Sequence, residues 1–191
     1  MKVLIETSAR HIHLSREDSN KLFGKNYELK IKRNLSQPGE FLSTEKISLE
    51  VNGNKFDNIS VLGPLREKTQ VEISLTDSRK LKIKVPIRES GNIENSPGGV
   101  LIGPNGYAEI KCGIIVAKRH IHMSPSDASI GGFIEGEECN LEVITENRSL
   151  IFSQTLIRIS EKFKLCAHID TDESNAAGID GPVFGMITRS F

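Results

Sequence analysis

The stretch Ser8-Ala9-Arg10-His11-Ile12-His13-Leu14-Ser15 returns later in the chain as Ala117-Lys118-Arg119-His120-Ile121-His122-Met123-Ser124. The sequence contains five histidines, and four of them lie in these two Arg-His-Ile-His units; the fifth is His168. Neutral imidazole is the commonest protein ligand for zinc-like metals. Nearly all of the histidine therefore lies in two short segments that are suited to metal binding.

Each His-x-His unit is predicted to lie on a β-strand, because apolar residues precede it at positions 3–5 and 114–116. In a strand, residues two apart point to the same side, with Cα atoms about 6.5 Å apart, so both imidazoles can reach one ion. On a helix the two rings would diverge. After the units, Ser15 and Ser124 are typical helix N-caps, and Pro125 suits the first helical position. The pattern is a strand, a histidine pair and a short helix, twice.

The remainder of the chain is predicted to be mostly β. Turn signals such as Gly63-Pro64 and Pro104-Asn105-Gly106 separate short alternating runs, a rhythm typical of small barrels or sandwiches. A βαβ rhythm is absent. The predicted strands cover residues 1–6, 27–31, 46–51, 70–75, 81–85, 107–110, 114–117, 140–145, 150–159 and 163–169.

Composition excludes several classes of function. Lys+Arg and Asp+Glu are both 25, so net charge gives no reason to expect nucleic acid or an anionic membrane as a partner. Apolar runs are far shorter than the ~20 residues of a membrane helix, and the start does not resemble a signal peptide. The three cysteines form no Cys-x-x-Cys pair, which favours a reducing, cytoplasmic setting without disulfides.

Further ligands have to come from elsewhere in the chain. His168 shares one face of a predicted strand with Cys166, and Glu72 lies on the polar face of another, a few residues after Arg66 in a predicted turn. Each has an ordinary alternative: a lone strand histidine is usually a core or edge residue, and a single Glu or Arg is usually solvated. Cys166 could be a metal ligand, a nucleophile or a small apolar filler. The residue pattern alone leaves these choices open.

Taken together, these motifs resemble the propanediol-utilisation type of phosphotransacylase, the phosphate propanoyltransferase family. The resemblance runs in the family's order from about residue 3 to residue 177 and is carried by residues 10–15, 63–74, 96–104, 117–125 and 163–173. It implies a mostly β fold of two interlocked small β-barrels with short capping α-helices. Residues 1–10 and 117–191 would form one barrel and residues 11–116 the other, with the active site between them.

The resemblance also implies the site residues. His11, His13 and Glu72 would bind one zinc ion, whose remaining position can take the coenzyme A sulfur. His120, His122 and His168 would bind a second zinc with positions open for water or phosphate. Arg66 falls at the family's phosphate-contacting arginine. The residues that align with the coenzyme A pocket are Ser8, Arg33 and Asn175.

The expected reaction is reversible: acetyl- or propanoyl-CoA plus phosphate gives acyl phosphate plus CoA. Two other classes stay open, namely a dinuclear metal hydrolase acting on thioesters and a non-catalytic zinc-binding module. We further expect a homodimer in the cytoplasm, with acyl-CoA, CoA and phosphate as its partners. Family members in bacterial microcompartments carry an N-terminal amphipathic helix, and strand-like residues begin here at Met1, so we do not expect encapsulation by that route.

Overall fold

The computed structural model describes residues 1–189, and Ser190 and Phe191, at the end of the predicted segment 117–191, lie outside the described residues. The chain forms two compact units, which are described separately. Unit 1 contains Met1–Ser8, Ser36–Pro38 and the chain from Lys118 onward, and unit 2 contains Ala9–Leu35 and Gly39–Ala117. Within the described residues, no helix is long and apolar enough to span a membrane.

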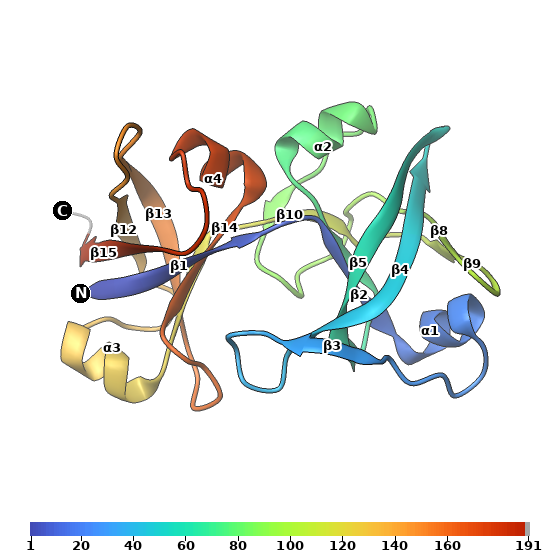
Figure 1. Ribbon diagram of the computed structural model, residues 1–191, viewed down its shortest axis with the longest axis horizontal. Helices are drawn as coiled ribbons and strands as arrows, with labels where there is room; N and C mark the ends of the chain where they lie inside the picture. Colours follow the sequence, from blue (N-terminus) through green and yellow to red (C-terminus); the bar gives the residue numbers. More distant parts are fainter. Residues whose placement is uncertain (190–191) are drawn as a thin grey trace. The chain divides into compact units, whose positions relative to one another are not determined.

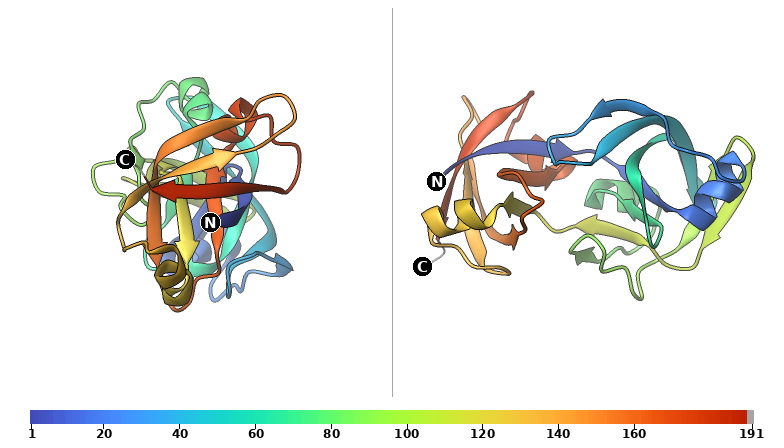
Figure 2. Two further views of the ribbon diagram at one scale, coloured as in Figure 1. Left: turned by 90° about the vertical axis from the view of Figure 1, so that its left-hand side faces the viewer. Right: turned by 90° about the horizontal axis from the view of Figure 1, so that it is seen from below.

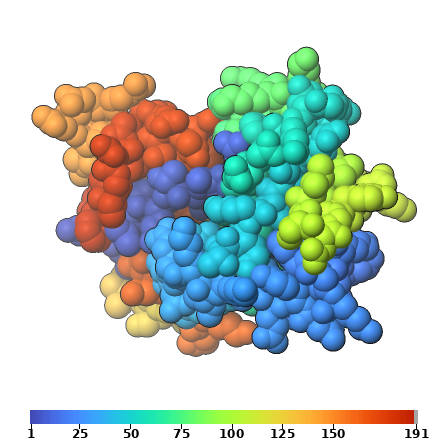
Figure 3. All heavy atoms as spheres, turned by 45° about the vertical axis from the view of Figure 1, so that its right-hand side comes forward, coloured from blue at the N-terminus to red at the C-terminus, as the bar shows by residue number. Residues whose placement is uncertain are grey.

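Unit 1 is a closed barrel in which strands from both ends of the chain are neighbours (Figures 1 and 2). Its strand order is β1-β14-β11-β13-β12-β15. In the space-filling view, dark-blue atoms of the N-terminal strand lie directly against red atoms of the C-terminal part (Figure 3). The elements are β1 (Lys2–Ser8), β11 (His120–Met123), α3 (Pro125–Gly131), β12 (Glu138–Val143), β13 (Leu150–Ile159), β14 (Cys166–Asp170), α4 (Thr171–Ala176) and β15 (Val183–Arg189).

Unit 2 is built on a nine-stranded sheet with the order β7-β10-β6-β2-β5-β4-β8-β9, and β3 pairs with β4. The predicted mostly β fold with short helices is therefore confirmed, with one closed barrel and a second sheet. The elements are β2 (His11–Ser15), α1 (Arg16–Phe23), β3 (Ile31–Asn34), β4 (Phe41–Val51), β5 (Asn54–Arg66), β6 (Gln70–Glu72), α2 (Leu75–Lys80), β7 (Ile87–Arg88), β8 (Gly99–Gly103), β9 (Gly106–Ile110) and β10 (Ile114–Ala117).

The two units repeat one pattern of strand pairing around the His-x-His strands. In unit 2, β2 is parallel to β5 and antiparallel to β6; in unit 1, β11 is parallel to β13 and antiparallel to β14. A further parallel strand flanks each pattern, β10 beside β6 and β1 beside β14. The strand that precedes each His-x-His unit in the sequence thus pairs within the opposite unit.

Each unit encloses its own apolar core, as alternating strand residues require. In unit 1 the core includes Val3, Ile121 and Leu141, all at most 1% exposed. In unit 2 it includes Ile12, Leu49 and Val71, which are fully buried. The apolar residues between the histidines, Ile12 and Ile121, therefore anchor the strands and turn both neighbouring imidazoles to the opposite side.

Several predicted elements were wrong. Residues 27–30 and 81–85 form no strand, and β3 begins only at Ile31. The apolar side chains of both segments pack on the unit 2 core without a partner strand. The predicted strand 70–75 ends at Glu72, since Ser74 caps helix α2. Gly63-Pro64, which we interpreted as a turn, lies inside β5, and Arg66 is the last residue of that strand.

Candidate metal centres

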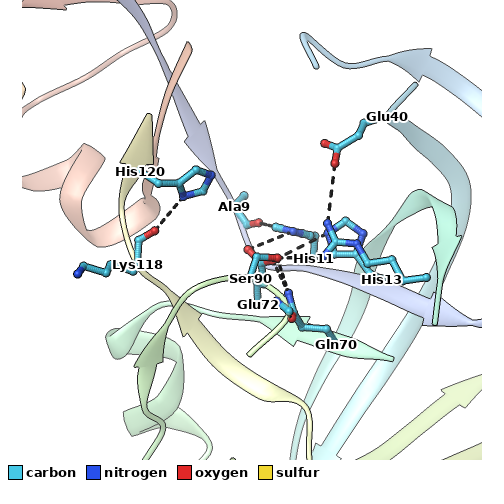
Figure 4. A network of polar contacts seen from close by, with 11 residues as sticks. Ala9, His11, His13, Glu40, Gln70, Glu72, Ser90, Lys118 and His120 are labelled. Atoms are coloured by element: carbon cyan, nitrogen blue, oxygen red, sulfur yellow. Dashed lines mark hydrogen bonds and ion pairs between the residues drawn. The ribbon is translucent and has the colours of Figure 1, made fainter. Parts of the chain in front are cut away.

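The first group of metal-ligating side chains, which we call the unit 2 triad, consists of His11, His13 and Glu72 (Figure 4). The histidines share one side of β2, with ring centroids 5.0 Å apart, and Glu72 lies opposite His11 in the antiparallel strand β6. All three are at least 90% buried. One donor atom from each lies within 4.8 Å of the others.

Hydrogen bonds fix the orientation of two of these side chains. His11 Nδ1 lies 2.8 Å from the carbonyl oxygen of Ala9, which leaves Nε2 facing Glu72 Oε2 at 3.4 Å. Glu72 Oε1 accepts hydrogen bonds from Gln70 Nε2 at 2.6 Å and from Ser90 Oγ at 2.9 Å. Oε2 of the carboxylate therefore faces His11, while Oε1 accepts both hydrogen bonds and lies 3.9 Å from Nε2 of His13.

The electrostatics of the unit 2 triad favour a cation. Burial alone would raise the pKa of Glu72, but the charge and hydrogen bond of His11 hold that pKa well below its usual range. Burial lowers the pKa of His11, yet Glu72 outweighs burial and the net shift is upward. Burial, followed by repulsion from His11 and Arg66, holds the pKa of His13 well below its usual range. The carboxylate of Glu72 thus raises the affinity of His11 for a proton, and the same negative charge would favour a bound metal cation.

The second group, the unit 1 triad, consists of His120, His122 and His168. Its ring centroids lie 4.7 to 5.2 Å apart, and His168 on β14 lies opposite His120 on β11. His120 Nδ1 lies 2.9 Å from the carbonyl oxygen of Lys118, as His11 does from that of Ala9 (Figure 4). Burial, with repulsion from His120 and His168, lowers the pKa of His122 to about 2, so this imidazole is neutral at physiological pH.

All six triad residues occupy equivalent positions in the two units. Glu72 pairs with His11 in the register in which His168 pairs with His120. Each triad strand leads into the following helix through the same three-residue pattern: a ligand candidate, a buried apolar residue and a helix N-cap. The four instances are His13-Leu14-Ser15, Glu72-Ile73-Ser74, His122-Met123-Ser124 and His168-Ile169-Asp170.

Sequence reasoning missed two of these four helices and the residues that anchor them. The predicted helices after Ser15 and Ser124 are confirmed as α1 and α3. The signal for α2 and α4 was present, since Ser74 and Asp170 are each followed three residues later by an acid, Asp77 and Glu173. Asp77 and Glu173 are also the ion-pair partners of the arginine in each Arg-His-Ile-His unit.

That arginine attaches each His-x-His strand to the helix that follows the third triad residue. Arg10 Nη2 lies 3.3 Å from Asp77 Oδ1, and Arg119 Nη1 lies 2.7 Å from Glu173 Oε1. Both guanidinium groups also lie over a phenylalanine ring of the parallel neighbour strand, Phe56 or Phe152. These arginines therefore hold the triad strands in place, which their position beside the histidines did not reveal.

The other predicted site residues lie as follows. Arg66 donates from Nη1 to Ser90 Oγ at 2.9 Å and lies close enough to shift the pKa of Glu72 downward. Ser8 ends β1 opposite Asp170, and the exposed Asn175 lies on α4, so both belong to unit 1. Arg33 is exposed on β3 in unit 2. The structure thus groups Arg66 with the unit 2 triad and gives Ser8 and Asn175 neighbouring elements.

Both triads fit a zinc-like ion. Two donors bound to one tetrahedral zinc at about 2.0–2.2 Å stand roughly 3.4 Å apart, which is the separation of His11 Nε2 and Glu72 Oε2. His122 supplies a second observation: within residues 1–189, neither of its buried ring nitrogens has a hydrogen-bond partner. Buried polar groups are rarely left in that state, so a ligand for one of these nitrogens is expected.

One more group meets the same geometric condition: Glu6, Cys166 and His168, which shares His168 with the unit 1 triad. Cys166 is 1% exposed, and burial, followed by the nearby Glu6 charge, raises the pKa of its thiol to about 12. A thiol with that pKa is protonated at neutral pH and is a poor nucleophile. This favours the apolar-filler interpretation of Cys166.

Comparisons with known proteins all identify the same enzyme family. A family model described as phosphate propanoyltransferase matches residues 4–180. A Thermotoga maritima protein of that name is 46% identical over 175 residues, which cover 92% of this chain and 83% of the relative. A Listeria monocytogenes protein of the same name is 44% identical over 187 residues, covering 98% of this chain and 87% of the relative. A third, from Shewanella putrefaciens, is 45% identical over 174 residues, with 91% and 82% covered.

Proposed function

We propose that this chain, which belongs to the phosphate propanoyltransferase family, is a zinc-dependent enzyme that transfers acetyl or propanoyl groups reversibly between coenzyme A and phosphate. The observation that carries the proposal is the pair of equivalent triads, each with three protein donors. Structural zinc sites use four protein ligands, whereas catalytic sites use three and keep one position for substrate or water. Among residues 1–189 each donor group ends at three members, which supports open, reactive sites.

The assignment of ligands follows the triads. His11, His13 and Glu72 would hold one ion, and His120, His122 and His168 the other. When bound, the two ions would stabilise a leaving thiolate and bind and polarise phosphate oxygens, because zinc accepts both sulfur and oxygen ligands. Each triad would hold a dication with at most one carboxylate, so each site would be positive, which suits an anion such as phosphate or a thiolate.

Arg66 would bind phosphate. Its guanidinium donates to Ser90, and its 3.8 Å ion pair with Glu40 is too long for a strong hydrogen bond. A planar guanidinium can give a phosphate two parallel hydrogen bonds, so Arg66 can fix both the place and the orientation of the nucleophile. Orientation matters here because phosphate is a weak nucleophile, and alignment with the thioester carbonyl supplies much of the rate.

The proposed reaction needs no nucleophile from the protein. A phosphate oxygen attacks the thioester carbonyl carbon, the carbon–sulfur bond breaks, and the sulfur leaves with the bonding electron pair as the CoA thiolate. The acyl group ends on the phosphate oxygen. Ser8, Arg33 and Asn175 remain our proposed contacts for coenzyme A. The homodimer and the cytoplasmic location remain predictions.

The test is CoA release from acetyl-CoA or propanoyl-CoA with and without phosphate. We expect release that depends on phosphate and is matched by an equal amount of acyl phosphate, with arsenate as a substitute acceptor. Release without phosphate would instead identify a thioester hydrolase. No release from a chain that contains its metals would favour the non-catalytic zinc module.

Replacing Cys166 with serine is expected to change neither metal content nor kcat by more than about a factor of two, because the buried thiol takes no part in the proposed reaction. Metal analysis and the CoA-release assay measure the two quantities. Cys139→Ser is the matched control, since Cys139 is also buried in unit 1 and has a thiol pKa raised to about 12 by burial, then by Glu137. Loss of an ion in Cys166→Ser alone would make Cys166 a ligand.

A further inference from the structure

His168 differs from His11 and His120 in the group that faces its Nδ1 atom. His11 and His120 have a backbone carbonyl there, two residues earlier in the chain. His168 Nδ1 instead faces a carboxylate, Glu6 Oε2, at 4.0 Å. If Nδ1 faces Glu6, the nitrogen of His168 that remains for its triad is Nε2.

The position of Glu6 is set by the fold and by a second residue from a distant segment. Glu6 lies directly opposite His168 in the parallel pair of β1 and β14. Ser36 Oγ donates a hydrogen bond of 2.6 Å to Glu6 Oε2. Ser36 belongs to Ser36–Pro38, the short segment of the β3–β4 connection that is part of unit 1. Gln37 fixes this segment through two hydrogen bonds with the Lys164 backbone, 2.9 and 3.2 Å long.

The equivalent position in unit 2 has the same kind of support. Glu72, the counterpart of His168, is held by a hydroxyl from Ser90 and a side chain from its own strand, Gln70. In unit 2 the serine and the glutamine bond Glu72 directly, whereas in unit 1 the serine bonds Glu6, which faces His168. The unit 1 version has the chemistry of a carboxylate–histidine–metal relay, in which an acid fixes the tautomer and raises the basicity of the imidazole.

We propose that Glu6, supported by Ser36, is a positioning residue that accepts a hydrogen bond from Nδ1–H of His168 and so directs Nε2 of His168 to the unit 1 metal. This inference rests on the proposed function, since it takes the unit 1 triad as a metal site. It assigns the Nδ1 side of His168 to a hydrogen bond, and therefore excludes a metal held by Glu6, Cys166 and His168. The proposal requires the 4.0 Å separation of His168 Nδ1 and Glu6 Oε2 to shorten to hydrogen-bond length when the metal binds.

The experiment measures cobalt(II) and zinc affinity by chelator competition, in full-length chains that carry His13→Ala so that only the unit 1 site binds tightly. Glu6→Ala should weaken binding by about 10- to 100-fold, the usual effect of losing such a partner. Glu6→Gln should lose less, because its amide oxygen can still accept the hydrogen bond; it also serves if the alanine variant folds poorly. Glu142→Ala removes a carboxylate from β12, which does not pair with β14, and should leave affinity unchanged.

Two results would overturn the inference while leaving the proposed function intact. One is equal metal affinity in Glu6→Ala and its parent. The other is a sulfur-to-cobalt charge-transfer band that disappears in Cys166→Ser, which would place the metal on the Nδ1 side of His168. A parent chain that binds no metal in unit 1 would overturn the proposed function itself, and the inference with it.

Discussion

Replacing His122 with alanine is expected to lower bound metal from two ions per chain to one and to reduce kcat by on the order of 1000-fold, the scale of losing a group that stabilises transition-state charge. His122 is buried, is neutral because its pKa is lowered to about 2 by burial and its histidine neighbours, and has no hydrogen-bond partner for its ring within residues 1–189. A metal ion bound to one of its ring nitrogens would satisfy this buried imidazole. Elemental analysis and the CoA-release assay measure both effects.

The matched control is Phe163→Leu. The Phe163 ring stacks on His122 with centroids 4.0 Å apart, so this variant disturbs the packing of the imidazole while keeping every donor. It should retain two ions per chain. If His122→Ala is folded by circular dichroism and still binds two ions, the unit 1 triad is not a metal site.

The second large effect is expected for Arg66→Ala, which should raise the KM for phosphate and lower the corresponding kcat/KM by about 100-fold, because a bidentate charged contact to the nucleophile is lost. The KM for acyl-CoA should change little, since the proposed role concerns phosphate alone. Arg66→Lys should recover only part of the loss, because an ammonium cannot reproduce the planar fork. Steady-state kinetics with phosphate and acyl-CoA varied separately measure the two constants.

Arg88→Ala is the control for this prediction. Arg88 is another arginine of unit 2 that donates hydrogen bonds to neighbouring polar groups, Asn92 and the carbonyl of Glu94, and it has no proposed part in the site. Its removal should leave both KM values unchanged. An unchanged phosphate KM in Arg66→Ala would remove Arg66 from the proposed mechanism.

Local patterns explain what the sequence could predict. The His-x-His strands and the capped helices after Ser15 and Ser124 depend on residues close together in the chain, and the structure has all four elements. The same cap pattern at Ser74 would have ended the predicted strand 70–75 at the correct place. The end of strand β5 was interpreted as a turn because Gly63-Pro64 is typical of turns, whereas here Gly63 lies within the strand and leaves room for the Phe41 ring of β4; the rest of β5 was not predicted.

Long-range pairing explains what the sequence could not predict from its own patterns. That Glu72 lies opposite His11, and His168 opposite His120, depends on the register between strands far apart in sequence. Nothing local to Glu6 distinguishes it from an ordinary strand carboxylate until β1 is placed beside β14. Similarly, the ion pair between Arg119 and Glu173 joins residues that only the β11–β14 pairing brings together.

The central claim is that each unit holds one metal ion on three protein donors. Crystals grown with CoA and phosphate, measured at the zinc absorption edge, test it directly through anomalous scattering. We predict two peaks per chain, one bonded to His11, His13 and Glu72 and the other to His120, His122 and His168. A single peak, or a peak bonded to Cys166, would contradict the account.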